Sequence, residues 1–327
     1  MSRSNGTLDG WLGTSSSSNQ KRSDDGNNGQ SKAKRKPRFS EAAMKRREQL
    51  AATARETQMH LERIIPELPT PFKPEESERV FLSSLKPLTS AECPRRSLVK
   101  TKINVVNEDT FNAAMRMDAS RAAGGGRVAV LNMASHANPG GGWLRGALAQ
   151  EEALCYRSSL YLSLNKRWYP WKQLMGLYSP DVVIIRSDMA TGHKLYHHNP
   201  NNYSYVSVLS IAALRCPDLK TISENTPGGV KTRKVFAKDE DRTMTKDKMR
   251  LCIRMAARKG HRSLVLGALG CGAFRNPPEE VAICWLEVLQ EEEFGGGWWD
   301  AIWFAIYDTR NEGNFEVFEK ILGGQEI

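Results

Sequence analysis

Residues 131–164 read LNMASHANPGGGWLRGALAQEEALCYRSSLYLSL, and the rest of the chain is organised around this stretch. It begins as the end of a buried strand, continues as a glycine-rich loop and ends as a helix with two acids in its first turn. Residues 140–142 are glycines, so a ligand can lie directly on their backbone. Glu151 and Glu152 lie where a helix has free backbone N–H groups, a position that favours anionic chemistry.

Each half of this stretch also has a plain structural explanation. A glycine-rich loop beside a helix can be a simple turn, and we expect turns at the two other glycine triplets, 124–126 and 295–297. An acidic first turn is favourable on any exposed helix. The combination indicates a site, because the glycines are followed by a short spacer and then by Gln150, Glu151 and Glu152.

The composition fits a soluble globular protein with basic character. The chain has 327 residues, 40% of them apolar, and a formal net charge of +10. This is enough for one large domain with extensions. No apolar run is long enough to cross a bilayer and the N-terminus lacks the apolar core of a signal peptide, so we expect an intracellular protein without a membrane partner. The positive charge suits polyanionic partners.

The cysteine pattern argues against a metal site. The six cysteines are scattered and form no Cys-x-x-Cys motif, so we expect buried free thiols in a reducing compartment. We therefore expect neither a metal nor a cofactor. The cysteines are Cys93, Cys155, Cys216, Cys252, Cys271 and Cys284.

Strand and helix patterns alternate downstream of residue 100. This alternation predicts an α/β sandwich with a mostly parallel central sheet, which places ligands at the carboxyl ends of its strands. A helix over residues 40–65 with Ser40 as its N-cap precedes the sheet, and the polar segment 223–241 is expected to be a surface insertion. We expect strands at 102–106, 127–132, 182–186, 203–211, 263–267 and 302–307, and helices at 109–121, 148–164, 243–258 and 277–294.

A second glycine-rich loop, GALGCGAF at residues 267–274, follows a predicted strand. The inward-facing N–H groups of such a turn can form an anion nest suited to a diphosphate, although a simple strand-to-helix turn is the alternative. Asn276 is expected to cap the next helix, with Pro277 in its first turn and Glu279 three residues after the cap.

The motifs NPGGGWL at 138–144 and AQEEAL at 149–154 resemble the signature of microbial-type poly(ADP-ribose) glycohydrolases, which are catalytic macrodomains. The second loop is similar to the family's phosphate-side loop. The resemblance implies a macrodomain-like three-layer α/β/α sandwich with a mixed, mostly parallel sheet and an N-terminal helical extension. It divides the chain into a disordered basic and polar tail (1–39), a packed helix with a Pro-rich linker (40–95) and a catalytic domain (96–327).

The implied activity is metal-independent cleavage of ribose–ribose O-glycosidic bonds in poly(ADP-ribose), which releases ADP-ribose. By resemblance, Glu152 transfers the proton, Glu151 holds ribose hydroxyls and Gln150 supports the site. Residues adjacent on a helix point about 100° apart, so the two acids are not expected to act on one atom from opposite sides, as paired glycosidase carboxylates do. A helix N-terminus lowers a carboxylate pKa, and we expect the bound diphosphate to raise it again.

The resemblance also implies contacts with the ligand. Asp109 would accept a hydrogen bond from the adenine amino group, but it is an equally good N-cap for the following helix. Asn138 would contact the distal ribose or stabilise the turn, and Phe274 would orient that ribose or pack in the core. The implied binding residues are Asp109, Asn138, Gly140, Gly141, Gly142, Gln150, Gly270, Gly272, Ala273 and Phe274.

Two short features stand out in the N-terminal tail. The cluster KRKPR at 34–38 is either a nuclear localisation signal, which would place the protein in the nucleus, or a solvated basic tail. Residues 5–12, NGTLDGWL, are spaced like peptides that dock on DNA sliding clamps, with Asn5 in place of the usual Gln. If they act as a localisation signal and a clamp-docking peptide, these features would connect the reversal of ADP-ribosylation to the DNA damage response.

Three other functions remain open from the sequence. One is a reader that binds ADP-ribose without cleaving it, although such a reader would need neither Glu151 nor Glu152. Another is a hydrolase for single ADP-ribose units on protein or nucleic acid. The last is a repair adaptor that acts through its tail.

Overall fold

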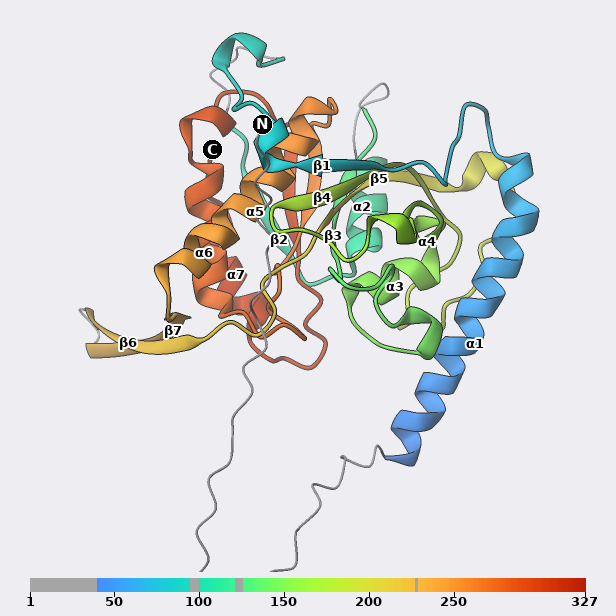
Figure 1. The fold of residues 1–327 in the computed structure, drawn as a ribbon, viewed down its shortest axis with the longest axis horizontal. Helices are drawn as coiled ribbons and strands as arrows, with labels where there is room; N and C mark the ends of the chain where they lie inside the picture. The colour runs from blue at the N-terminus through green and yellow to red at the C-terminus, as the bar shows by residue number, and fades with distance from the viewer. Residues whose placement is uncertain (1–39, 95–99, 121–125, 227–228) are drawn as a thin grey trace, which may run out of the picture. The chain divides into compact units, whose positions relative to one another are not determined.

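A seven-stranded sheet forms the centre of the protein, with the strand order β1-β4-β5-β3-β8-β9-β2 (Figure 1). The computed structural model describes residues 40–94, 100–120, 126–226 and 229–327. Strands β5, β3, β8, β9 and β2 run parallel. At one edge, β4 pairs antiparallel with β5 and β1 pairs antiparallel with β4, which confirms the mixed, mostly parallel sheet. The strands are β1 Glu78–Phe81, β2 Ile103–Val106, β3 Ala129–Met133, β4 Met175–Ile184, β5 Ser204–Ile211, β8 Ser263–Leu266 and β9 Ala301–Ala305.

Helices cover both faces of this sheet and complete three layers (Figure 1). Successive side chains of a strand point to opposite faces, so a strand between two helical layers must be apolar throughout. In β3, Ala129 and Leu131 pack with α5, α6 and α7, whereas Val130 packs with α1, α2 and α3. The helices are α1 Glu41–Ile64, α2 Thr110–Ala119, α3 Gln150–Arg157, α4 Leu160–Ser163, α5 Asp239–Arg258, α6 Pro278–Leu289 and α7 Asn314–Leu322.

Helix α1 is built into the same compact unit, Glu41–Ile327. Its Leu50 and Ala54 are buried in the core that α2 and α3 share. Its backbone also touches the loop between β3 and α3 at Gly146, which has a φ of +72°. A Cβ atom at Gly146 would lie 2.0 Å from the backbone oxygen of Arg47, so only glycine allows this close approach.

The single helix expected over residues 148–164 is two helices, α3 and α4, because the chain turns toward β4 between them. Ser158 has extended dihedral angles, with a φ of −151°. The Ile185 N–H donates to the Arg157 carbonyl (2.9 Å), and the Ser159 N–H donates to the Val183 carbonyl (3.1 Å). These bonds to the neighbouring strand replace the next turn of helix.

The polar segment expected to be a surface insertion contains regular structure. Strands β6 (Leu219–Thr226) and β7 (Gly229–Phe236) form an antiparallel hairpin, and α5 begins three residues later at Asp239. The hairpin is mostly exposed, while Val235 and Phe236 at its base are buried. The sequence analysis also did not predict strand β1 or helix α7.

The predictions for residues 5–12 and 34–38 lie outside the described residues, and the glycine triplet at 124–126 is described only at Gly126. Within the described ranges, no helix combines the length and the apolar character needed to cross a membrane.

The contact between Gly146 and α1 predicts a large effect of Gly146→Ala. The new methyl group would push α1 away from the loop between β3 and α3, so we expect the free energy of unfolding to fall by about 3 kcal/mol. Urea denaturation measures this change. Gly260→Ala is the matched control, because Gly260 has a similar φ of +75° but nothing within 4 Å of its Cβ position. It should lose only about 1 kcal/mol, and equal losses would contradict the steric explanation.

Candidate active site

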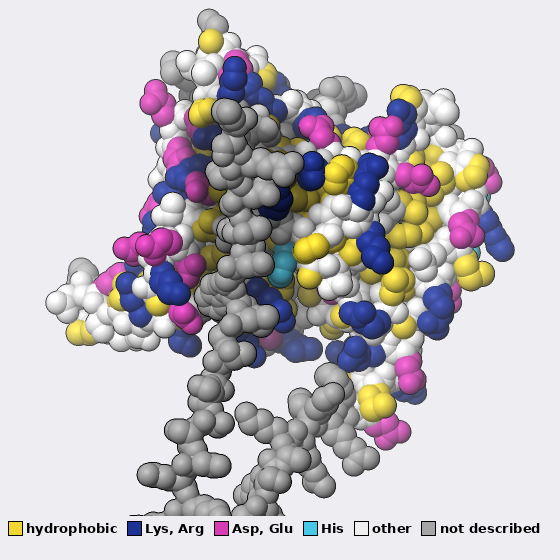
Figure 2. All heavy atoms as spheres, viewed as in Figure 1, with side chains coloured by type: hydrophobic (Ala, Val, Ile, Leu, Met, Phe, Trp, Pro, Cys, Tyr) yellow, Lys and Arg dark blue, Asp and Glu magenta, His cyan; other side chains and the backbone are white. Residues whose placement is uncertain are grey.

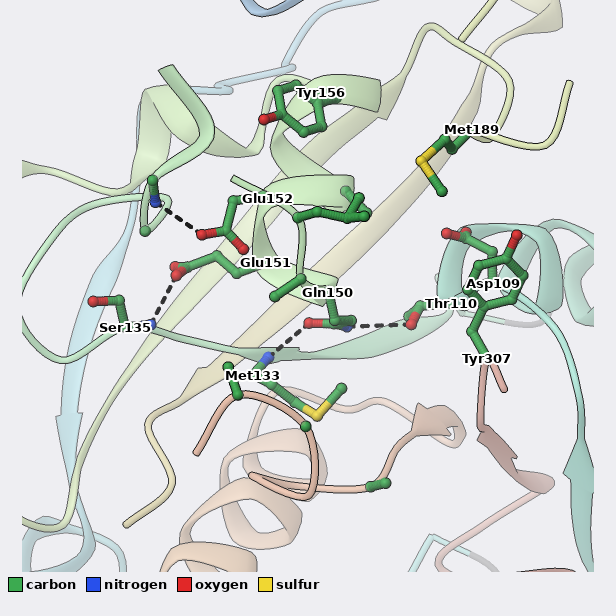
Figure 3. A pocket seen from close by; sticks show the side chains of 18 of the residues that line it. Asp109, Thr110, Met133, Ser135, Gln150, Glu151, Glu152, Tyr156, Met189 and Tyr307 are labelled. Atoms are coloured by element: carbon green, nitrogen blue, oxygen red, sulfur yellow. Dashed lines mark hydrogen bonds between the residues drawn. The ribbon is translucent and has the colours of Figure 1, made fainter. Parts of the chain in front are cut away.

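An open cavity of about 1210 Å³ lies where the parallel strands end (Figure 3). Its walls come from the segments that follow β2, β3, β4, β5, β8 and β9, together with the first half of α1. Both glycine-rich loops identified in the sequence line it, so the cavity lies at the sheet edge where an open α/β sheet is expected to bind its ligand. A cavity of this size accepts a ligand larger than a typical cofactor.

The side chain of Gln150 ties three elements together at the base of the cavity (Figure 3). Its Oε1 accepts a hydrogen bond from the Met133 N–H (2.9 Å). Its Nε2 donates to the Leu131 carbonyl (2.7 Å) and to Thr110 Oγ1 (3.2 Å). The end of β3 and the first turns of α2 and α3 are thereby held in register.

The first glycine loop forms a surface on which both acids rest. Gly140 and Gly141 have φ values of +64° and +61°, in the left-handed region that favours glycine. A Cβ atom at Gly141 would lie 2.4 Å from Glu152 Oε1 and 3.1 Å from Glu151 Oε2. The two carboxylates therefore lie against the same peptide, and they do not face each other across a substrate.

Glu152 is held through one of its two oxygens. Its Oε1 accepts a hydrogen bond from the Gly142 N–H (2.8 Å), as Figure 3 shows. Its Oε2 has no hydrogen-bond partner among the residues that the structure describes. Glu152 is 8% exposed and lines the cavity, so this oxygen is the one left for a ligand.

Glu151 is buried more deeply and is held through both oxygens. Its Oε2 accepts a hydrogen bond from the Ser135 N–H (2.8 Å), and its Oε1 accepts from Asn132 Nδ2 (3.4 Å). Burial raises the pKa of Glu151 to about 8; the Ser135 N–H opposes this shift and the charge of Glu152 adds to it. Loss of solvation is thus the largest effect on the pKa of the Glu151 carboxyl, although Glu151 lies in the first turn of α3.

Asp109 fills the structural role considered for it. Its carboxylate caps α2 by accepting from the N–H groups of Phe111 (2.8 Å) and Asn112 (3.3 Å), and it pairs with the buried guanidinium of Arg157. Asp109 also lines the cavity, beside Tyr307 in Figure 3. Capping leaves the carboxylate at the cavity wall, so it does not exclude a contact with a ligand.

The second glycine loop is closed by Asn276. Gly270 has a φ of +79°, and a Cβ atom there would lie 2.5 Å from Asn276 Nδ2. That nitrogen donates to the Leu214 carbonyl (2.7 Å) and the Gly270 carbonyl (3.1 Å). The prediction that Asn276 caps the next helix is wrong: Pro277 is the N-cap residue, and the Asn276 side chain is turned inward to hold the loop.

The remaining predicted ligand contacts lie at the rim of the cavity. Asn138, Gly272 and Ala273 are exposed, and Phe274 is partly buried, so it is not a core residue. The structure brings every predicted site residue except Gly140 to the cavity wall, and Gly140 lies directly beneath Trp143.

Sequence reasoning missed several lining residues. Tyr307 is the last residue of the last predicted strand, so the strand-end rule could have identified it. Ser135 takes part through its backbone N–H, which no residue type reveals. The wall that α1 contributes had no signal in the sequence, because it depends on how the helix packs.

Among the described residues, no group of three or more His, Cys, Asp or Glu side chains is arranged to hold a metal ion. Glu151 and Glu152 share the cavity lining with other ionisable side chains, among them Asp109, Asp188 and Asp308.

The fold and site define a class: a macrodomain-type α/β/α domain whose ligand cavity holds an acidic pair on a glycine loop. Residues 38–187 match the microbial-type poly(ADP-ribose) glycohydrolase (PARG) catalytic domain. Over this part of the sequence, the chain is therefore similar to the catalytic domain of microbial-type PARG.

Solved structures agree with this assignment. PARG from Thermomonospora curvata has 26% identity and a TM-score of 0.64, and the match covers 84% of this chain and 99% of that one. The same bacterial enzyme bound to the inhibitor ADP-HPD gives 26% and 0.62 over the same shares. PARG from Deinococcus radiodurans in complex with ADP-ribose has 29% identity and a TM-score of 0.58, covering 75% of this chain and 94% of that one. A comparison with curated proteins gave no match.

The buried state of Glu151 predicts a pH-dependent effect of Glu151→Gln on stability. A carboxyl whose pKa rises on folding keeps its proton in the native state while the unfolded chain loses it, so wild-type stability falls as pH rises from about 4.5 to about 8. The glutamine variant lacks this loss. Its stability relative to wild type should therefore improve by a few kcal/mol between pH 5 and pH 8, since one pKa unit corresponds to about 1.4 kcal/mol.

Urea denaturation at the two pH values measures the difference. Glu48→Gln, an exposed substitution on α1, is the control and should show no such trend. A relative stability of Glu151→Gln that is constant or declining with pH would show that Glu151 is ionised in the native protein.

Proposed function

We propose that this protein hydrolyses ribose–ribose O-glycosidic bonds of poly(ADP-ribose) and releases ADP-ribose, with Glu152 as the proton-transferring acid. The single observation that carries the proposal is the placement of Glu152. Its Oε1 is fixed by the Gly142 N–H, and its Oε2 is left for a ligand in a cavity floored by glycines.

The cavity has the features that an ADP-ribose unit requires. Backbone N–H groups of a glycine-rich turn suit a diphosphate, and the loop at Gly270 supplies such a turn at the cavity wall. The flat backbone at Gly141 allows a ribose to lie directly beside both acids. The complex of ADP-ribose with the PARG of Deinococcus radiodurans supports the same class of ligand for this cavity.

The proposed reaction needs one proton donor near the leaving oxygen. Glu152 gives its proton to that oxygen as the glycosidic bond breaks, and positive charge develops on the anomeric carbon. Water then attacks that carbon, and Glu152 takes back the proton that the water loses. The products are ADP-ribose and a polymer shortened by one unit, and the acid ends in its starting state.

Glu151 assists because it is buried. With a pKa of about 8 it is protonated near neutral pH, so it can hold a ribose hydroxyl without adding a second charge beside Glu152. The negative charge of a bound diphosphate also favours the protonated form of Glu152. We infer that the substrate itself helps to keep the catalytic proton in place.

We propose two further roles for the N-terminal tail, both based on sequence alone. The basic cluster at 34–38 supports a nuclear location and a part in the DNA damage response, and residues 5–12 support docking to a DNA sliding clamp. A pull-down with the clamp, comparing wild type with Trp11→Ala, tests the second role.

The substitution Glu152→Gln tests the catalytic proposal. Glutamine keeps an oxygen for the Gly142 N–H but has no proton to transfer, so turnover should fall by about 10²-fold or more. Affinity for ADP-ribose should stay within about twofold, because the cradle is unchanged. Release of ADP-ribose from purified polymer measures the first quantity and calorimetry measures the second.

The exposed variant Glu48→Gln controls for a general effect of removing a carboxylate. Full turnover by Glu152→Gln would remove Glu152 from the mechanism. A wild-type protein that binds ADP-ribose but releases none from polymer would instead be a reader, and release only from singly modified protein would indicate a mono-ADP-ribosyl hydrolase.

A further inference from the structure

The cavity extends past the catalytic acids to helix α1. Arg46 and Gln49 of α1 line it, and so do Arg145 and Leu148 of the loop between β3 and α3, which we call the catalytic loop. None of these four residues is in the glycine-rich segments 140–142 and 267–274 to which the distal ribose and the diphosphate were assigned above. A substrate that consists of one ADP-ribose unit would leave this part of the cavity without a function.

This part of the cavity is on the Glu152 side of the site. Figure 3 places Tyr156 beside Glu152, on the side away from Met133. The Tyr156 hydroxyl lies 2.9 Å from the Trp143 carbonyl oxygen, at the start of the short turn that carries Arg145. Burial raises the pKa of Tyr156, the charge of Glu152 raises it further and the charge of Arg47 on α1 lowers it. The catalytic acid and helix α1 therefore both lie close enough to influence the Tyr156 hydroxyl.

The catalytic geometry determines what must lie on this side. In glycosidic cleavage the acid protonates the leaving oxygen, so the leaving part of the substrate is next to the acid. In the polymer, that part is the neighbouring unit, which brings an adenosine and a diphosphate. The subsite that receives it should therefore offer positive charge and some apolar surface.

Arg46 and Arg145 offer that charge. Both side chains are exposed, and neither has a hydrogen-bond or ion-pair partner within the described part of the chain. Guanidinium groups bind phosphate oxygens through two parallel hydrogen bonds. Leu148, which is 42% exposed at the same wall, provides apolar surface of the kind on which a base can lie.

The wall is also held in place, as a binding surface requires. The Arg47 side chain donates to the Arg145 carbonyl (3.4 Å), and Gly146 packs on the Arg47 backbone. Figure 2 shows Lys and Arg side chains, with apolar ones between them, on the face that carries α1. Helix α1 thus presents Arg46 at a fixed distance from the catalytic loop.

We propose that Arg46, Arg145 and Leu148 form an acceptor subsite that binds the adenosine diphosphate of the neighbouring polymer unit. This inference rests on the proposed function, since it concerns the leaving group of that reaction. The subsite contributes to polymer recognition and leaves the binding of the ADP-ribose unit itself unchanged. It makes helix α1 part of the substrate-binding surface.

The combined variant Arg46→Glu and Arg145→Glu tests the subsite. Its KM for polymer should rise about tenfold or more, because two phosphate contacts become repulsive, while kcat changes by less than about twofold. Its Kd for free ADP-ribose should match that of wild type, since free ADP-ribose has no neighbouring unit. Steady-state kinetics on polymer and calorimetry with ADP-ribose supply the two readouts.

The control is Arg55→Glu, which makes one of the two charge reversals on the opposite face of α1, half a turn around the helix from Arg46. It should leave KM for polymer within about twofold, since solvent and salt screen the effect of one exposed charge on the distant subsite. Equal KM values for wild type and the combined variant would overturn the subsite. It would also be overturned if the variant bound free ADP-ribose more weakly by the same factor as its KM for polymer rises. A wild type that releases nothing from polymer would overturn the proposed function as well, which keeps the two failures distinct.

Discussion

The close approach of two carboxylates to the peptide of Gly141 is the constraint on which the site depends. A side chain at that position would occupy the space of Glu152 Oε1. Because the loop has no side chains there, the acids can be packed against backbone, and one oxygen of Glu152 remains available. The open cradle for the sugar and the fixed position of the acid are therefore consequences of the same glycines.

The surrounding fold holds this arrangement from several directions. Gln150 joins the end of β3 to the first turns of α2 and α3, so the acids that follow it begin their helix at a fixed place. Gly146 lets α1 pack against the loop from the other side. The catalytic loop is thus held between the sheet and a helix that comes much earlier in the sequence, which is why α1 contributes to the cavity wall.

Burial separates the two acids into different roles. Both lie in the first turn of α3, where the helix dipole would favour ionisation of each. Glu151 is 3% exposed, and desolvation raises its pKa to about 8 despite the hydrogen bond from Ser135. A neutral carboxyl beside an acid with a free oxygen is an arrangement that two exposed acids in a first turn could not produce.

The sequence by itself determined the alternating elements, both glycine loops and the pair Glu151 and Glu152, because periodicity and glycine spacing are local properties. It failed at Asn276 and at the break after Arg157, where contacts with Leu214 and with β4 replaced the local helix signals. Only the tertiary structure decided the burial of Glu151 and the approach of α1 to the catalytic loop. Solvation and contacts between distant segments depend on packing, and no single stretch of residues encodes them.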